Sequence, residues 1–101
     1  MPWVRVAKTS DIQEGQIRTF AVGSKKIAVA HVGKAFFAVD DTCTHLQCSL
    51  GGGTVSNGEV ECPCHGARFD LATGEVRALP APISIQAYKV KVGGEELFVE
   101  I

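Results

Sequence analysis

The chain lacks the features of a membrane or exported protein. None of its apolar runs approaches the ~20 residues that a membrane-spanning helix needs. Its first residues, Met1-Pro2-Trp3-Val4-Arg5, contain neither the basic nor the apolar region of a signal peptide. We therefore expect a soluble, cytoplasmic protein, and its 101 residues predict a single domain, 1–101.

Net charge is also small. A formal charge of −1 gives no support for nucleic-acid binding. The charge is nevertheless uneven, because residues 40–70 contain five acids and one base, or −4, while the remainder contains nine bases and six acids, or +3. The acidic segment is either a set of ordinary solvated loops or a docking face for a basic partner.

Helical patterns are limited to one turn at Thr9–Ile12, and short apolar or alternating segments dominate instead. Glycine-containing pairs such as Gly23-Ser24, Gly33-Lys34 and Gly93-Gly94 separate several of these segments, as turns do between strands. The expected strands are Val4–Ala7, Ile17–Val22, Ile27–Val32, Ala35–Val39, Ile83–Val92 and Leu97–Ile101. This pattern predicts an all-β sandwich or barrel.

Residues 41–82 have a different composition, rich in Gly, Cys, Thr and Pro. We interpret them as a subdomain inserted between strands of the β scaffold. At about forty residues, the insertion is too short to hold a core without a metal. Its Gly51-Gly52-Gly53 run is not followed by Lys-Ser/Thr, so it is not a phosphate loop; it is either a close backbone passage by the metal centre or a flexible loop.

Two motifs in this segment combine cysteine with histidine: Cys43-Thr44-His45 and Cys62-Pro63-Cys64-His65. Their spacing allows two loops to clamp one metal centre with two thiolates and two imidazoles. Such a set suits a 2Fe–2S cluster in which Cys43 and Cys62 bind one iron and His45 and His65 bind the other. A structural Cys2His2 zinc site and a purely disulfide-bonded domain are the alternatives, and both would be colourless.

The segments Cys43-Thr44-His45-Leu46-Gln47-Cys48 and Cys62-Pro63-Cys64-His65-Gly66 resemble the two boxes of the Rieske iron–sulfur family. The resemblance covers nearly the whole chain and includes a proline-bearing third loop at Leu79–Pro82. It implies a Rieske-type β-sandwich, one Rieske-type 2Fe–2S cluster and the same four ligands. Residues that it places around the cluster are Leu46, Gly66, Ala67, Phe69 and Pro80.

Cys48 and Cys64 are the cysteines outside the ligand set. They form either a disulfide that ties the two loops together or a pair of reduced thiols. In the quinol-oxidising respiratory members of the family the matching positions form a disulfide, whereas most ferredoxins of ring-hydroxylating dioxygenases lack the pair. The chain thus resembles a dioxygenase ferredoxin in size and a respiratory protein at this pair.

Ala67 and Phe69 depart from the respiratory pattern, which has serine and tyrosine at the matching positions. Those hydroxyls donate hydrogen bonds to cluster sulfurs and raise the potential, and neither Ala67 nor Phe69 can do so. We therefore expect a potential toward the lower end of the Rieske range of roughly −150 to +300 mV. The segment Thr73–Pro80 is likewise similar to dioxygenase ferredoxins.

The resemblance implies an electron carrier between a flavoprotein reductase and a terminal oxygenase such as a ring-hydroxylating dioxygenase. We expect a monomer, because a small carrier must dock and leave. The alternative is a small subunit of a nitrite reductase, an arsenite oxidase or a respiratory quinol-oxidising complex. We expect no catalytic residues, because no substrate pocket or catalytic base is evident. Asp40 and Asp41 point to opposite faces of a strand, and His31 has no second ligand nearby.

Overall fold

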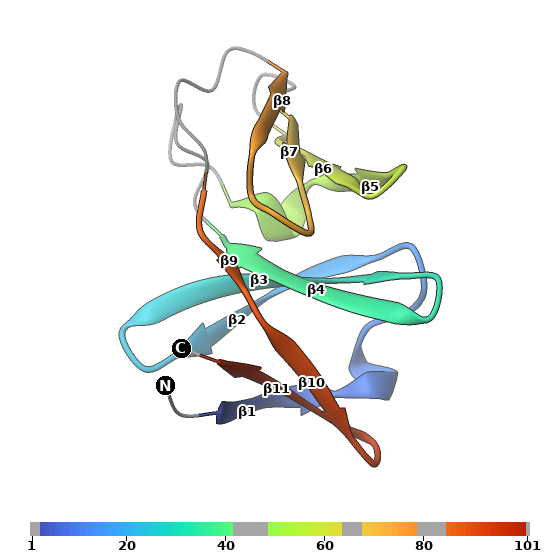
Figure 1. Ribbon diagram of the computed structural model, residues 1–101, viewed down its shortest axis with the longest axis vertical. Helices are drawn as coiled ribbons and strands as arrows, with labels where there is room; N and C mark the ends of the chain where they lie inside the picture. The colour runs from blue at the N-terminus through green and yellow to red at the C-terminus, as the bar shows by residue number, and fades with distance from the viewer. Residues whose placement is uncertain (1–2, 42–48, 64–67, 79–84, 101) are drawn as a thin grey trace.

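Three antiparallel sheets form three layers in the computed structural model, which describes residues 3–41, 49–63, 68–78 and 85–100 (Figure 1). The described strands are β1 (Trp3–Lys8), β2 (Ile17–Val22), β3 (Lys25–Val32), β4 (Ala35–Asp40), β5 (Thr54–Ser56), β6 (Glu59–Glu61), β7 (Arg68–Asp70), β8 (Val76–Ala78), β9 (Ala87–Tyr88), β10 (Val90–Gly93) and β11 (Glu96–Glu100). Two 3-10 helices, η1 (Thr9–Asp11) and η2 (Leu50–Gly52), complete the described elements. In this part of the chain, no helix has the length and apolar character needed to cross a membrane.

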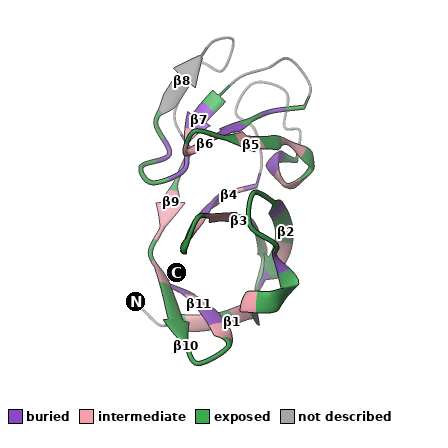
Figure 2. Cartoon of the chain, turned by 90° about the vertical axis from the view of Figure 1, so that its right-hand side faces the viewer, coloured by how far each residue is buried: buried purple, intermediate pink, exposed green. Residues whose placement is uncertain are grey.

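The sheets have the orders β1-β11-β10, β2-β3-β4-β9 and β5-β6-β7-β8. The β2–β4 sheet is the middle layer, with the β1 sheet on one side and the β5–β8 sheet on the other, as both views show (Figures 1 and 2). The expected all-β fold is confirmed. The first two sheets form the scaffold, and β5–β8 belong to the segment that lies between β4 and β9 in the chain.

Strand β3 is buried on both faces, because it runs through the centre of the middle layer. Ile27 and Val29 pack with Leu97 and Val99 in the core between the two scaffold sheets. Ala28 and Ala30 alternate with them and face a second core. This second core, here called the subdomain core, contains Ile17, Ala28, Ala30, Val39, Leu50, Val60, Cys62, Phe69, Leu71 and Ile85. The small alanines leave room for the inserted segment to pack closely on the sheet.

In place of the single strand expected at Ile83–Val92, the structure has two strands, β9 and β10. Residues 83–84 of the expected strand lie outside the described part. Strand β9 pairs with β4 in the middle sheet, and β10 pairs with β11 in the outer sheet. The chain changes sheet at Lys89, between them. The apolar alternation shifts here from odd-numbered positions up to Ala87 to even-numbered positions from Val90, and this shift is the sequence signal of the change.

Strands β5–β8 lie in the inserted segment, for which the sequence predicted a subdomain but no individual strands. Each has three residues, and their charged flanks hide the single buried positions Val60 and Phe69. One signal was present: Asn57-Gly58 is a strong two-residue hairpin turn. Both residues have positive φ, at 54° and 77°, and they join β5 to β6 with Ser56 paired to Glu59.

Candidate metal centre

The predicted ligands lie in segments that the structure describes only in part. Cys62 and Phe69 are among the described residues. The other predicted site residues lie outside the described residues; they are Cys43, His45, Leu46, Cys48, Cys64, His65, Gly66, Ala67 and Pro80. Within the described part, no group of three or more His, Cys, Asp or Glu side chains is arranged to hold a metal ion.

The described ends of these segments nevertheless lie close together. Glu61 and Ala78 both pair with Arg68, so the segments 62–67 and 79–84 leave the β5–β8 sheet from the same end. Gly53 lies against the carbonyl of Glu61, since a Cβ at Gly53 would be 2.2 Å from that oxygen. The chain that follows the first box therefore contacts the residue before Cys62.

Cys62 lies directly after β6 and is 2% exposed. It belongs to the subdomain core, where its fellow members include Val60, Phe69 and Leu71. An apolar environment disfavours isolated charge. Two ferric ions, two sulfides and two thiolates sum to zero, so a cluster with two histidine ligands suits this surrounding better than a four-cysteine cluster of charge −2. The donor set and the burial of Cys62 therefore fit a Rieske-type cluster.

Phe69 lies in the middle of β7 and is fully buried in the same core. Its backbone pairs with Val60 of β6 and Val76 of β8. Its side chain carries no hydrogen-bond donor. Around Cys62, Phe69 thus contributes apolar packing, in line with its predicted inability to donate to a sulfur.

Asp41 is the only charged or polar residue of the described part that is buried, at 3% exposure. Its Oδ1 accepts hydrogen bonds from Thr19 Oγ1 at 2.7 Å, Ser49 Oγ at 2.9 Å and the Gly51 backbone N–H at 2.9 Å. Its backbone carbonyl also accepts a hydrogen bond from the Leu50 N–H at 2.6 Å. The residues on either side of segment 42–48 are therefore bonded to each other.

Asp40 bonds to a different element, as expected for the opposite face of the strand. Its Oδ1 accepts the Tyr88 hydroxyl hydrogen at 2.6 Å, and its Oδ2 accepts the Gln86 N–H at 3.3 Å. Burial, together with the hydrogen bond to Asp40 and its charge, raises the pKa of Tyr88 well above the ordinary value. The two aspartates thus fix the departure of the inserted segment at β4 and its return at β9.

These contacts also bear on the acidic segment at residues 40–70. Asp41 is internal, and Asp40 is bonded to Tyr88. Asp70 accepts hydrogen bonds from the backbone of Ala72 and Thr73, and Glu59 lies 3.9 Å from Arg68. Much of the negative charge therefore has a structural role, and this weakens the interpretation of the segment as an acidic docking face.

His31 has structural contacts, as the sequence indicated. Its Nδ1 is 2.9 Å from the Ile12 carbonyl, and its ring stacks on Phe36 with 4.1 Å between centroids. Both contacts lie within the scaffold. The contacts of His31 are thus those of a structural histidine.

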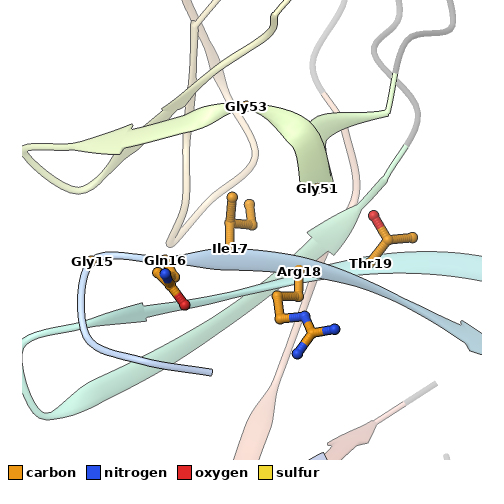
Figure 3. Close-up of a pocket in the computed structure, with 7 residues that line it drawn as sticks. All are labelled: Gly15, Gln16, Ile17, Arg18, Thr19, Gly51 and Gly53. Atoms are coloured by element: carbon orange, nitrogen blue, oxygen red, sulfur yellow. The ribbon is translucent and has the colours of Figure 1, made fainter. Parts of the chain in front are cut away.

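A groove of about 570 Å³ runs between the start of β2 and the η2 region (Figure 3). Residues 15–19 form one side, and Gly51 and Gly53 form the other. None of the described residues that line the groove carries a carboxylate or an imidazole. Gly51 is required by close packing here, because a Cβ would lie 1.7 Å from Thr19 Oγ1 and 2.8 Å from the Thr19 backbone nitrogen. Within the described residues, the Gly51-Gly52-Gly53 run thus approaches β2 through Gly51 and Glu61 through Gly53.

Residues 2–99 match the family model of the Rieske [2Fe-2S] domain. The chain belongs to this family. It is 39% identical over 98 residues to "Ferredoxin CarAc" of Metapseudomonas resinovorans, covering 96% of this chain and 92% of the relative. It is 34% identical over 101 residues to the ferredoxin component of biphenyl 2,3-dioxygenase of Rhodococcus jostii (strain RHA1), covering 100% and 94%.

Another similar protein is the cytochrome b6-f complex iron-sulfur subunit of Chlorobaculum thiosulfatiphilum, at 34% identity over 94 residues. The match covers 93% of this Rieske domain and 51% of that subunit. Among solved structures, the ferredoxin of carbazole 1,9a-dioxygenase from Nocardioides aromaticivorans IC177 has a TM-score of 0.93 and 34% identity, with 98% and 97% coverage. A complex of reduced oxygenase and oxidized ferredoxin in carbazole 1,9a-dioxygenase contains a chain with a TM-score of 0.88 and 39% identity, with 96% and 91% coverage.

These matches confirm the expected family, the Rieske-type 2Fe–2S cluster and the ferredoxin type of activity. The chain is an electron carrier of the kind that serves dioxygenase systems and is not an enzyme by itself. When bound, the cluster supplies a one-electron redox centre. The described residues Val60 and Phe69 pack in the same core as the Cys62 ligand candidate.

Proposed function

We propose that this Rieske protein accepts single electrons from a flavoprotein reductase and delivers them to a terminal oxygenase such as a ring-hydroxylating dioxygenase. The main support for this proposal is that the matches to the two dioxygenase ferredoxins cover nearly all of this chain and nearly all of each relative. The ferredoxin found in complex with its oxygenase supports the acceptor. The carrier works as a monomer in this proposal, since it must dock and leave.

The proposed ligands are Cys43 and Cys62 on one iron and His45 and His65 on the other. The spacing of the two boxes supports the set, together with the burial of Cys62 at the end of β6. The whole chain acts as one domain in this proposal, with residues 41–82 as its cluster-binding subdomain. Leu46, Gly66, Ala67 and Pro80 join Phe69 around the cluster.

Two finer features belong to the same proposal. Cys48 and Cys64 form a disulfide, which the match between these positions and the respiratory pattern supports. In this proposal the carrier operates in the cytoplasm, and cell fractionation tests this location. A protein found only in the membrane or periplasmic fraction would contradict it.

A role as a subunit of a larger oxidoreductase is the second candidate. The cysteine pair and the 34% identity to a cytochrome b6-f iron-sulfur subunit favour it. The chain spans about half of that subunit, however, whereas it spans more than nine-tenths of the two dioxygenase ferredoxins. Purification of a stable complex from cells would favour the second candidate over a free carrier.

The test replaces His45 with alanine and His65 with cysteine, and uses His31→Ala as a matched control. Both ligand variants should lose the Rieske electron paramagnetic resonance signal while keeping the circular dichroism of the β scaffold. His31→Ala should retain the signal, because the side chain of His31 contacts Ile12 and Phe36 within the scaffold. An unchanged signal in either ligand variant would overturn the ligand assignment. Electron delivery is then tested with a reductase and a dioxygenase in steady-state turnover.

A further inference from the structure

The base of segment 42–48 is closed by one side chain. Asp41 precedes the segment and Ser49 follows it, and the Ser49 hydroxyl donates to Asp41 Oδ1 at 2.9 Å. The Leu50 N–H donates to the Asp41 carbonyl at 2.6 Å, so a backbone bond lies beside the side-chain bond. The segment between them contains Cys43 and His45.

The closure is anchored on both sides. Asp41 is fixed to the scaffold by its own N–H, which donates to the Lys26 carbonyl at 3.1 Å, and by the Thr19 hydroxyl at 2.7 Å. Leu50 is fully buried in the subdomain core and fixes the other side. A buried carboxylate is costly unless hydrogen bonds satisfy it, so its position is strongly constrained.

Close packing adds a second, independent constraint. The Gly51 N–H donates to Asp41 Oδ1 at 2.9 Å. Gly51 reaches this position only because it lacks a Cβ, which would lie 1.7 Å from Thr19 Oγ1. Three donors from β2, from the end of the segment and from η2 thus converge on one oxygen atom.

We propose that Asp41 is a positioning residue for the cluster: it closes the base of segment 42–48 and thereby holds Cys43 and His45 in their binding geometry. The proposal rests on the ligand assignment given under the proposed function. Asp41 binds no iron in it and acts through the two ligands. In this proposal Asp41 reduces the conformational freedom of segment 42–48 before the cluster binds, and it slows loss of the cluster afterwards.

The test compares Asp41→Ala with Asp40→Ala in the cluster-loaded protein. Asp40 is adjacent and carries the same charge, but its side chain bonds to Tyr88 and Gln86 instead of the ends of the segment. Asp41→Ala should shift or broaden the Rieske resonance and change the reduction potential. It should also release iron to a chelator about tenfold faster, the loss expected for bonds to a charged group. Asp40→Ala should keep the wild-type line shape and release rate.

Conservative variants separate positioning from general stability. Asp41→Asn retains an acceptor oxygen, so it should restore most of the wild-type line shape and chelation rate. If Asp41→Ala does not fold, Ser49→Ala takes its place, with the exposed Ser56→Ala as control. Ser49→Ala should release iron faster than Ser56→Ala. Wild-type line shape, potential and release rate in both Asp41→Ala and Ser49→Ala would overturn the proposal.

Hydrogen exchange distinguishes this proposal from the proposed function. The Leu50 and Gly51 amides should exchange about tenfold faster in Asp41→Ala than in Asp40→Ala, while the amides of β2–β4 stay protected. If the wild-type protein shows no Rieske signal, the proposed function fails, and the exchange result alone decides whether Asp41 closes the segment. Equal exchange in the two variants would reject the closure itself.

Discussion

Tyr88 donates its hydroxyl hydrogen to Asp40 Oδ1 at 2.6 Å, across 48 positions of the sequence. The bond joins the end of β4 to β9, on either side of the inserted segment. Lys25 lies over the same ring, with its Nζ 5.4 Å from the centroid. The junction between scaffold and subdomain is therefore held by polar contacts as well as by the Val39–Ala87 and Ala38–Tyr88 strand pairs.

Tyr88→Phe should lower the free energy of unfolding by about 1.5–3 kcal/mol below pH 10, the range for a hydrogen bond to a charged group. The pKa of Tyr88 is raised in the folded state, so the unfolded chain loses this proton first as pH rises above about 10. The stabilisation is complete below that pH and decreases above it. Urea unfolding at pH 8 and pH 11 measures the difference between the two proteins.

Lys25 lies over the Tyr88 ring, so its charge has to be controlled for in this comparison. The comparison is repeated in a Lys25→Gln background, where the stability difference between the protein with Tyr88 and its Tyr88→Phe variant should decrease with pH in the same way. A difference that stays constant from pH 8 to pH 11 would show that the Asp40 bond does not hold the phenol proton.

Gly51→Ala and Gly52→Ala form a matched pair in η2. A Cβ at Gly51 would overlap Thr19, including its backbone nitrogen, whereas a Cβ at Gly52 meets nothing within 4 Å. Gly51→Ala should therefore lower the free energy of unfolding by about 1–3 kcal/mol, the range for overpacking. Gly52→Ala should change stability by at most about 0.5 kcal/mol. Urea unfolding gives both values, and equal effects would argue against the close contact of η2 with β2.

Ala67→Ser should raise the reduction potential, because a serine hydroxyl at this position would donate a hydrogen bond to a cluster sulfur. Ala72→Ser is the control, since Ala72 is an exposed alanine in the turn after β7. The potentials are measured by redox titration followed by electron paramagnetic resonance. A potential that does not rise in Ala67→Ser would refute the hydrogen-bond explanation for a low wild-type value.

The state of Cys48 and Cys64 is measured by alkylating the unfolded, iron-free protein without reductant. Two of the four cysteines should be labelled if these residues form a disulfide. Replacing both with serine should then lower stability by roughly 3 kcal/mol in the chain-entropy model. Labelling of all four cysteines would indicate reduced thiols. The double serine variant should then lose far less than about 3 kcal/mol of stability.

The scaffold strands could be predicted because each is bounded by local signals. Ile17–Val22 was predicted with its observed bounds, and Gly23 and Gly33 have positive φ in the turns around β3. The change of sheet at Lys89 was missed, although the apolar positions shift there from odd numbers up to Ala87 to even numbers from Val90. The short strands β6 and β7 each bury one residue, which leaves no periodic pattern to detect.

The site was predicted less evenly. The ligand assignment rests on the spacing of the two boxes, a local feature of the sequence, and it stays a prediction because Cys43, His45 and His65 lie outside the described residues. The role of Asp41 was missed, because its partners Ser49, Gly51 and Thr19 are 8, 10 and 22 positions away. The sequence indicated only that Asp40 and Asp41 face opposite ways, and their separate partners confirm this.

The pairing of β1 with β11 has a consequence for synthesis on the ribosome. Residues 3–8 pair with residues 96–100, so the outer sheet has to wait for the last strand to emerge. Hairpins β2–β3, β3–β4 and β5–β6 join neighbouring segments and are translated long before it. Both Cys/His boxes therefore leave the ribosome before the outer sheet is complete. Cells thus have an interval in which the proposed iron ligands have been made and the scaffold is still open on one side.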